Sequence, residues 1–115
     1  MNRANAGKRR HRITLESPTI TQSTTNGEKT TTWESEAEVW AAIEPVAGSG
    51  RETLIAKSFN ATTSHRITIL YRGDIRNTWR VRFGSRTFGI DGIITPDEIK
   101  DSQILYCTET IARGA

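Results

Sequence analysis

The side chains that could carry out chemistry in this chain are few and widely spaced. His11, His65 and Cys107 occur without any CxxC or HExxH pattern, so no metal-binding motif is present. No motif brings a serine or cysteine nucleophile next to a histidine and an acid. Gly48-Ser49-Gly50 precedes a helix-like segment but lacks the GxxxxGK[ST] sequence of a phosphate-binding loop. The sequence therefore predicts no enzyme, no metal ion and no cofactor.

The arginines are stronger candidates for a functional surface. Six arginines and only two acids, Asp74 and Asp91, occur between residues 64 and 94. Arginine suits contacts with phosphates or with an acidic protein surface. The aromatic residues of this stretch share the face that alternation assigns to the core, so no platform for stacking bases is predicted. The candidates for contacts with another subunit or with DNA are Arg72, Arg76, Arg80, Arg82 and Arg86.

Three predicted strands between Ser64 and Ile94 position these arginines. Apolar and polar residues alternate over 65–72, 79–83 and 86–90, which is typical of half-buried strands. Gly84 suits the first central position of a type II′ turn, because that position needs a positive φ. The resulting register pairs Val81 with Phe88, Trp79 with Ile90 and Arg82 with Thr87.

The first half of the chain predicts two strands and a polar hairpin between them. A strand is expected over 9–16, with Ile13 and Leu15 inward and Arg12, Thr14 and Glu16 outward, until Ser17-Pro18 interrupts it. Residues 19–32 contain Asn26-Gly27, a strong turn signal, and almost no large apolar residue, so they predict a protruding hairpin. A second strand is expected over 38–45, with Trp40 on the face opposite Val39, Ala41 and Ile43.

One helix and one further strand complete the prediction. Ser49 and Glu52 have the spacing of a capping box, and Leu54, Ile55, Ser58 and Phe59 fit one helical face, so a short helix is expected over 50–58. The last strand is expected over 102–110. The pattern predicts an all-β, mainly antiparallel fold, a small bent barrel or sandwich of about six strands with one short helix.

Length and composition predict a single domain spanning residues 1–115, with a flexible arm over 1–8. Hydrophobic residues make up 35% of the chain, and no apolar run is long enough to cross a membrane. One cysteine suits a reducing compartment. The net charge of +3 is segregated, since residues 1–12 and 64–94 are basic and residues 28–52 are acidic. This could give one acidic and one basic surface, or an ordinary solvated one.

Several segments together resemble the head–tail joining family of long-tailed bacteriophages, the head-closure or stopper proteins. The matching segments are RRHRITLE, NGEKTTTW, VWAAIEPVAGSGRE, SHRITILYRGDI, RVRFGSRTFGIDGI and ILYCTE, in this order. The resemblance implies a non-enzymatic neck protein of the virion, assembled in the cytoplasm of the host bacterium. Its expected partners are further copies in a ring of six or twelve, the portal or adaptor ring, the tail terminator or tail tube, and packaged double-stranded DNA, without a membrane.

The resemblance also implies roles for particular segments. The segment 46–63 matches one that can project toward the DNA channel and help to close it, with Gly48, Ser49, Gly50, Arg51, Glu52 and Lys57 as candidates. The alternative is a helix that caps one open end of the barrel. The polar hairpin and the basic N-terminus are expected to contact adjacent rings, through Arg9, Arg10, Asn26, Gly27, Lys29 and Trp40. The alternatives for the whole chain are a tail terminator or other neck component, or a small basic barrel that binds nucleic acid.

Overall fold

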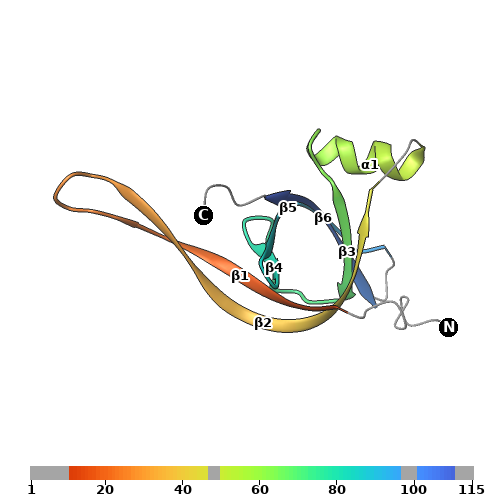
Figure 1. The fold of residues 1–115 in the computed structure, drawn as a ribbon, viewed down its shortest axis with the longest axis horizontal. Helices are drawn as coiled ribbons and strands as arrows, with labels where there is room; N and C mark the ends of the chain where they lie inside the picture. The colour runs from red at the N-terminus through yellow and green to blue at the C-terminus, as the bar shows by residue number, and fades with distance from the viewer. Residues whose placement is uncertain (1–10, 47–49, 97–100, 111–115) are drawn as a thin grey trace.

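The computed structural model describes residues 11–46, 50–96 and 101–110. Six strands and one helix follow one another along the chain: β1 (His11–Gln22), β2 (Lys29–Pro45), α1 (Arg51–Phe59), β3 (His65–Leu70), β4 (Arg80–Phe83), β5 (Arg86–Ile94) and β6 (Ser102–Thr110). All neighbouring strands pair antiparallel, in the order β1-β2-β3-β6-β5-β4, and β4 returns to β1. The sheet therefore closes into a barrel, one of the two architectures that the sequence pattern predicted (Figure 1).

The barrel core consists of the side chains that alternation assigned to the inside. Ile13, Leu15, Ile67, Val81 and Phe88 have no exposed surface. Trp79, Phe83 and Ile93 pack against this core and are partly buried. The burial of these apolar side chains stabilises the closed sheet.

The hairpin between β4 and β5 has the predicted register. Val81 pairs with Phe88 and Arg82 with Thr87. The Ile90 amide donates to the Trp79 carbonyl at 3.5 Å, although β4 begins one residue later, at Arg80. Gly84 has φ = 61°, as the turn requires. Turn chemistry and apolar pattern thus agree in this hairpin.

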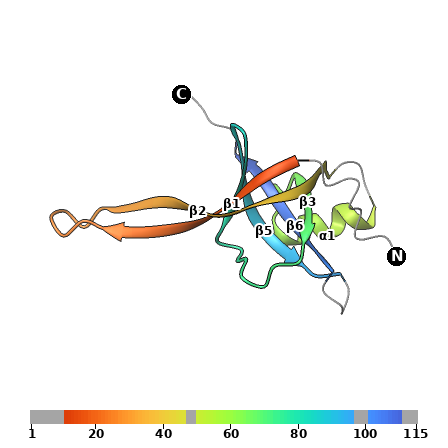
Figure 2. The ribbon, with the colours of Figure 1, turned by 90° about the horizontal axis from the view of Figure 1, so that it is seen from below.

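β1 and β2 extend beyond the barrel as a two-stranded arm, residues 17–34 (Figures 1 and 2). The arm gives the molecule its length, since the principal extents are 56 × 29 × 27 Å. Its register runs from Ser17 opposite Glu34 to Gln22 opposite Lys29. Its end is a loop over residues 23–28 that contains the predicted turn signal Asn26-Gly27, with Gly27 at φ = 74°. The arm and α1 lie on opposite sides of the barrel (Figures 1 and 2).

The predicted interruption of the first strand at Ser17-Pro18 is wrong. β1 continues through Pro18, which pairs with Trp33. Only the barrel part of β1, at Thr14–Glu16, pairs with a second strand, so Pro18 lies where one strand edge is open. A strand tolerates proline at such an edge. The register shifts between Leu15 and Glu16, where β2 contributes an extra residue, and such a bulge bends the strand at the point where the arm leaves the barrel.

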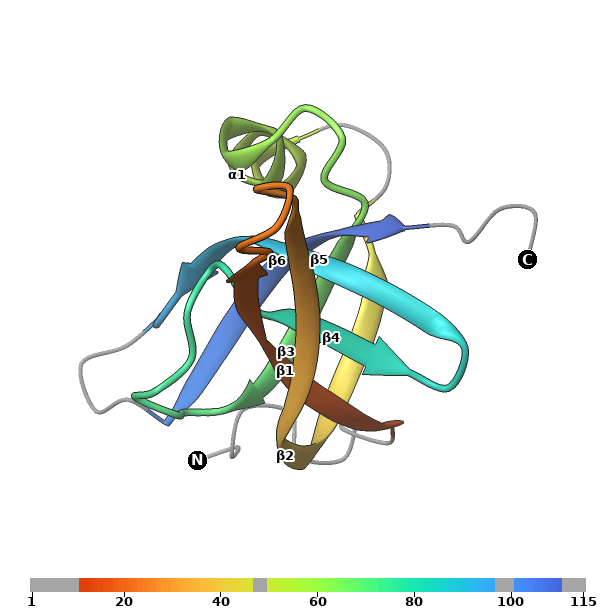
Figure 3. The ribbon, with the colours of Figure 1, turned by 90° about the vertical axis from the view of Figure 1, so that its left-hand side faces the viewer.

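The helix lies outside the barrel wall and begins and ends one residue later than expected (Figure 3). Gly50, not Ser49, is the N-cap residue, and no side chain caps the helix, so the expected capping box is wrong. The predicted apolar face is wrong too, because Leu54 is 71% exposed and the only buried residue is Ala56. The short helix packs through its end: the Phe59 ring stacks on Tyr106 with 5.6 Å between ring centroids.

Candidate assembly surfaces

Glu16, Arg80 and Trp33 form a cluster where the arm meets the barrel. Glu16 lies on the outer face of β1, as predicted, but it is only 8% exposed. Arg80 covers it, since its Nε donates to Glu16 Oε1 at 2.6 Å. The Arg80 guanidinium also stacks on the Trp33 ring, 4.2 Å from the ring centroid. The ion pair and the cation–π contact together fix the base of the arm against β4.

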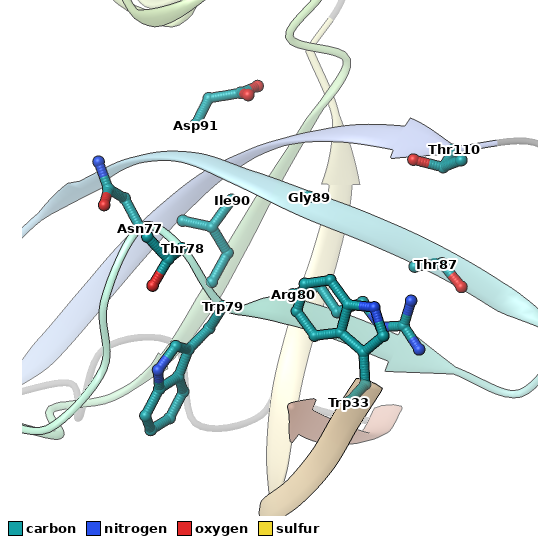
Figure 4. A pocket seen from close by; sticks show the side chains of 10 residues that line it. All are labelled: Trp33, Asn77, Thr78, Trp79, Arg80, Thr87, Gly89, Ile90, Asp91 and Thr110. Atoms are coloured by element: carbon teal, nitrogen blue, oxygen red, sulfur yellow. The ribbon is translucent and has the colours of Figure 1, made fainter. Parts of the chain in front are cut away.

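A groove of about 280 Å³ lies beside this cluster (Figure 4). Trp33 from the arm and Arg80 from β4 form one side, and the loop before β4, with Trp79, forms the other (Figure 4). β5 contributes the floor at Thr87 and Gly89. The remaining lining residues are Asn77, Thr78, Ile90, Asp91 and Thr110. Aromatic walls with a few polar groups are typical of a binding site for another molecule.

Arg86 belongs to a second ion-pair cluster with Glu109 and His65. Its Nε and Nη2 donate to the two oxygens of Glu109 at 2.9 and 3.1 Å. These hydrogen bonds lower the pKa of Glu109 and raise that of Arg86. Burial lowers the pKa of His65, whose Nε2 lies 3.4 Å from Arg86 Nη2. Because a guanidinium only donates, His65 Nε2 accepts, and His65 Nδ1–H donates to Ser64 Oγ at 2.9 Å.

The structure thus brings a serine, a histidine and an acid together, which the sequence did not suggest. Ser64 Oγ contacts His65 Nδ1, and His65 Nε2 lies 3.9 Å from Glu109 Oε1. The carboxylate is already occupied by Arg86, and Ser64 Oγ accepts a hydrogen bond from the Glu109 amide at 3.1 Å. None of these residues lines the groove at Trp33. The arrangement stabilises the pairing of β3 with β6 rather than activating a nucleophile.

The five predicted arginine candidates do not form one free basic face. Arg80 and Arg86 are in the ion pairs described above, and Arg72 donates to both oxygens of Asp74, at 3.1 and 2.8 Å. Arg82 is half exposed, and its Nη1 lies 3.9 Å from Glu16 Oε2. Arg76 donates only a long hydrogen bond to the Ile75 carbonyl, 3.4 Å, among the described contacts. Arg76 and Arg82 are therefore the members of the set with most charge available to a partner.

Trp40 lies on the outer face of β2, opposite to its core-facing neighbours, as predicted. It is 53% exposed, and the Arg12 guanidinium lies 5.3 Å from its ring centroid. A second hollow, of about 320 Å³, is lined by Val39, Trp40, Leu70, Tyr71 and Arg72. Leu70 is also 46% exposed. Two large apolar side chains are thus exposed together on this wall of the barrel.

Helix α1 is tied to the barrel by its charged residues as well as by Phe59. Glu52 pairs with Arg66, which also donates to Glu44 Oε1 at 2.7 Å. Lys57 Nζ donates to the carbonyls of Ala61 and Thr63, at 3.0 and 3.2 Å. Of the candidates for the channel-facing segment, Arg51 is exposed and makes no ion pair with the described residues, and Gly50 caps the helix. Gly48 and Ser49 lie outside the described residues.

Asp91 ties the chain after α1 to the barrel at the second bulge, where the register shifts between Ile90 and Gly92. Its Oδ2 accepts hydrogen bonds from Thr63 and Thr108, at 2.8 and 2.6 Å, and its Oδ1 accepts one from Asn60 at 3.3 Å. No sequence motif indicated this hydrogen-bonded cluster, because the partners of Asp91 are distant along the chain.

The candidates for contacts with adjacent rings are exposed where the structure describes them. Asn26, Gly27 and Lys29 lie at the end of the arm. The Asn26 side chain accepts from the Glu28 amide at 2.9 Å and so fixes the loop. Arg9 and Arg10 lie outside the described residues.

Within residues 11–46, 50–96 and 101–110, no three His, Cys, Asp or Glu side chains gather in a way that could hold a metal ion. In the same part of the chain, no helix has the length and apolar character needed to cross a membrane.

Comparison with known proteins identifies a family and several solved structures with a similar fold. The family model described as phage head completion protein matches residues 4–110. The solution structure of protein SF1141 from Shigella flexneri 2a is 32% identical, with a TM-score of 0.70 over 91% of this chain and 96% of that one. A chain from the virion of a native gene transfer agent particle has the same fold at 20% identity, with a TM-score of 0.63 over 88% of this chain and 94% of that one. No curated protein matches the chain.

Proposed function

The chain belongs to the phage head completion protein family, and on that premise we propose that it is a subunit of the head-closure ring. In this role, copies of the barrel form a ring beneath the portal or adaptor ring, extend the DNA channel, retain packaged DNA and present a surface to the tail. The subunit is a structural protein without catalytic activity. The observation that carries the proposal is a closed barrel with unlike elements on opposite sides, the polar arm on one and α1 on the other (Figure 1).

The arm and the barrel wall suit contacts with two different neighbours. The arm is polar and exposed, so it is free to contact an adjacent ring through Asn26, Gly27 and Lys29. The exposed Trp40 and Leu70 add an apolar surface on the barrel wall. A subunit between the portal side and the tail side needs such unlike surfaces, because it binds unlike partners.

The segment 46–63 is the candidate for lining the channel, with Arg51 as its available charge. The contacts of Glu52, Lys57 and Phe59 with the barrel support a fixed element rather than a freely moving gate. They favour neither channel position nor capping of the barrel end, because α1 lies on the outer wall (Figure 3). Charge reversal at Arg51 is expected to reduce DNA retention in filled heads and to leave folding unchanged.

A nucleic-acid-binding barrel is the alternative from another class, and the ion pairs argue against it. Arg72, Arg80 and Arg86 already have carboxylate partners, so binding phosphate at these positions would leave those acids unpaired. A tail terminator is the alternative within the neck, and it would bind tails rather than heads.

Binding of the purified protein to phage heads tests the proposal. The mass of the purified protein is measured by light scattering, first alone and then mixed with DNA-filled heads that carry the portal. We expect a fixed number of copies per head, six or twelve, and no binding to isolated tails. Binding only to tails would support a terminator instead. Binding only to free DNA, with a steep loss as salt increases, would support the nucleic-acid-binding barrel.

A further inference from the structure

Ile20 is an apolar side chain exposed in the middle of a polar arm. It is 65% exposed, and its position on β1 places it on the same arm face as Pro18 and Trp33, since side chains alternate along a strand. Its partner across the arm is Thr31, so its own subunit offers it no apolar cover there. A single exposed isoleucine is ordinary on a protein surface. It indicates a contact only if another subunit offers a hollow that fits it.

The groove beside Trp33 is such a hollow. Its floor includes Gly89, and neither the backbone conformation nor the packing within the subunit requires a glycine at this position. Gly89 lies inside β5 without a positive φ. A Cβ atom on Gly89 would meet nothing nearer than the Thr108 carbonyl oxygen, at 4.0 Å. Gly92, in the same strand, differs: the Phe59 ring occupies the space where its Cβ would lie. Glycine weakens a strand interior and often marks the close approach of another group.

One side of the groove carries positive charge that acidic groups of the arm could pair with. Glu16 is the single carboxylate that faces both Arg80 and Arg82, at 2.6 and 3.9 Å, so one positive charge is left over at this side of the groove. Arg82 is half exposed. On the arm, Glu28 is exposed, and Glu34 accepts a hydrogen bond from Thr19 at 3.4 Å but makes no ion pair with the described residues. Asp91 also lines the groove, so the excess positive charge belongs to the side at Arg80 and Arg82, where it would attract an acidic group of the arm.

The groove and Ile20 of one subunit do not meet, because Ile20 is not among the groove residues and the arm extends away from the barrel (Figure 2). We propose that the arm of one copy docks on the next copy, with Ile20 seated in the groove over Gly89, between Trp33 and Trp79. This inference rests on the proposed ring. An arm that binds a different surface on its neighbour makes a head-to-tail contact, and repetition of such a contact closes a ring when the rotation is suitable.

Cysteine cross-linking in assembled particles tests the contact. Particles are assembled with a variant carrying both Ile20→Cys and Gly89→Cys, treated with a mild oxidant and analysed by denaturing electrophoresis. We expect a ladder of dimers and higher multiples, because the two positions meet only between copies. Cys107 contributes little background, because it is fully buried and burial raises the pKa of its thiol.

Two controls separate this contact from chance collisions. Each single cysteine variant is expected to remain monomeric, and so is a variant with Leu54→Cys and Gly89→Cys, since Leu54 is 71% exposed on α1 at the opposite end of the molecule. The absence of a ladder in the Ile20 and Gly89 pair, with normal amounts of protein in the particles, would overturn the docking and leave the head-closure function intact. The absence of even the unaltered protein from particles would overturn both.

Filling the groove provides an independent test. Gly89→Leu places a side chain where Ile20 of the next copy is expected to sit, and Gly89→Ala places only a methyl group there. We expect Gly89→Leu to keep the unfolding midpoint of the isolated protein within a few degrees and to reduce head-bound protein by about tenfold or more, a loss typical of a blocked central contact. Gly89→Ala is the matched control and is expected to bind within a few-fold of the unaltered protein. Normal binding by Gly89→Leu would contradict the docking.

Discussion

Gly92→Ala is expected to detach the end of α1 from the barrel. A Cβ at this position would lie 2.3 to 2.5 Å from three atoms of the Phe59 ring, including Cγ, far inside van der Waals contact. The ring cannot give way at its tip alone, because Cγ is its attachment point. The variant must therefore expel Phe59 from Gly92 and Tyr106, or shift β5.

The cost follows from what Phe59 contributes in this position. Its side chain is 40% exposed, so more than half of its surface is buried. Full burial of such a side chain is worth about 1.5–3 kcal/mol, and an aromatic pair adds about 0.5–1.5 kcal/mol. We expect Gly92→Ala to lower the free energy of unfolding by about 2 kcal/mol. Urea denaturation followed by tryptophan fluorescence measures this change.

A double-mutant cycle makes the prediction specific. Phe59→Ala alone is expected to cost about as much as Gly92→Ala, because it removes the same contacts. With Phe59 already removed, Gly92→Ala has nothing to displace and is expected to add no further cost. Gly89→Ala is the matched control in the same strand and is expected to leave stability within about 0.5 kcal/mol. If Gly92→Ala proved as harmless as Gly89→Ala, the packing of α1 on the barrel through Phe59 would be refuted.

Three further predictions concern charges and the buried thiol. Glu16→Gln is expected to lower the free energy of unfolding by about 1–3 kcal/mol, since it leaves Arg80 without its partner in a nearly buried site. Glu38→Gln, which removes the exposed pair with Arg12, is expected to lower it by under about 0.5 kcal/mol in the same denaturation assay. Equal losses in the two variants would contradict this. Burial lowers the pKa of His65, so the unfolded state binds a proton at this residue first, and the free energy of unfolding falls as the pH drops through about 6.5. This pH-dependent loss is expected to disappear in His65→Gln. If the unaltered protein showed no such loss, the burial of the His65 ring would be contradicted. The thiol of Cys107 is expected to react with a maleimide only after denaturation, and rapid labelling of the folded protein would contradict its burial.

The sequence predicted which segments form strands and hairpins more reliably than it predicted where these elements begin and end. Alternation placed Ile13, Leu15, Ile67 and Phe88 in the core, where they are fully buried. It could not show that β1 continues through Pro18, because this depends on which strand edge remains open in three dimensions. Pattern reasoning also gave α1 the wrong apolar face. The packing of Phe59 depends on Gly92, more than thirty residues later, and a local pattern carries no such information.

The sequence predicted which residue types lie on the candidate surfaces but not which of their charges are paired. Arginines on outward positions of β4 and β5 could be identified from the alternation. The ion pairs of these arginines could not be identified in this way. Glu16 and Arg80, for example, are far apart in the sequence and meet only when β4 closes the barrel onto β1. The groove was missed for the same reason: its sides come from the arm and from the loop before β4 (Figure 4).

Closure of the barrel limits where this subunit can bind others through its backbone. In this closed sheet, the strand segments with one unpaired edge include the arm, the part of β2 before its pairing with β3 at Ala42, the start of β1 and the end of β5. A two-stranded ribbon alone is marginally stable in water. Contacts that hold the arm on a neighbour would therefore lower its free energy as well as link the copies, and the energetic gain of assembly would be largest at the arm. In the proposed ring, each copy would then be ordered by the next.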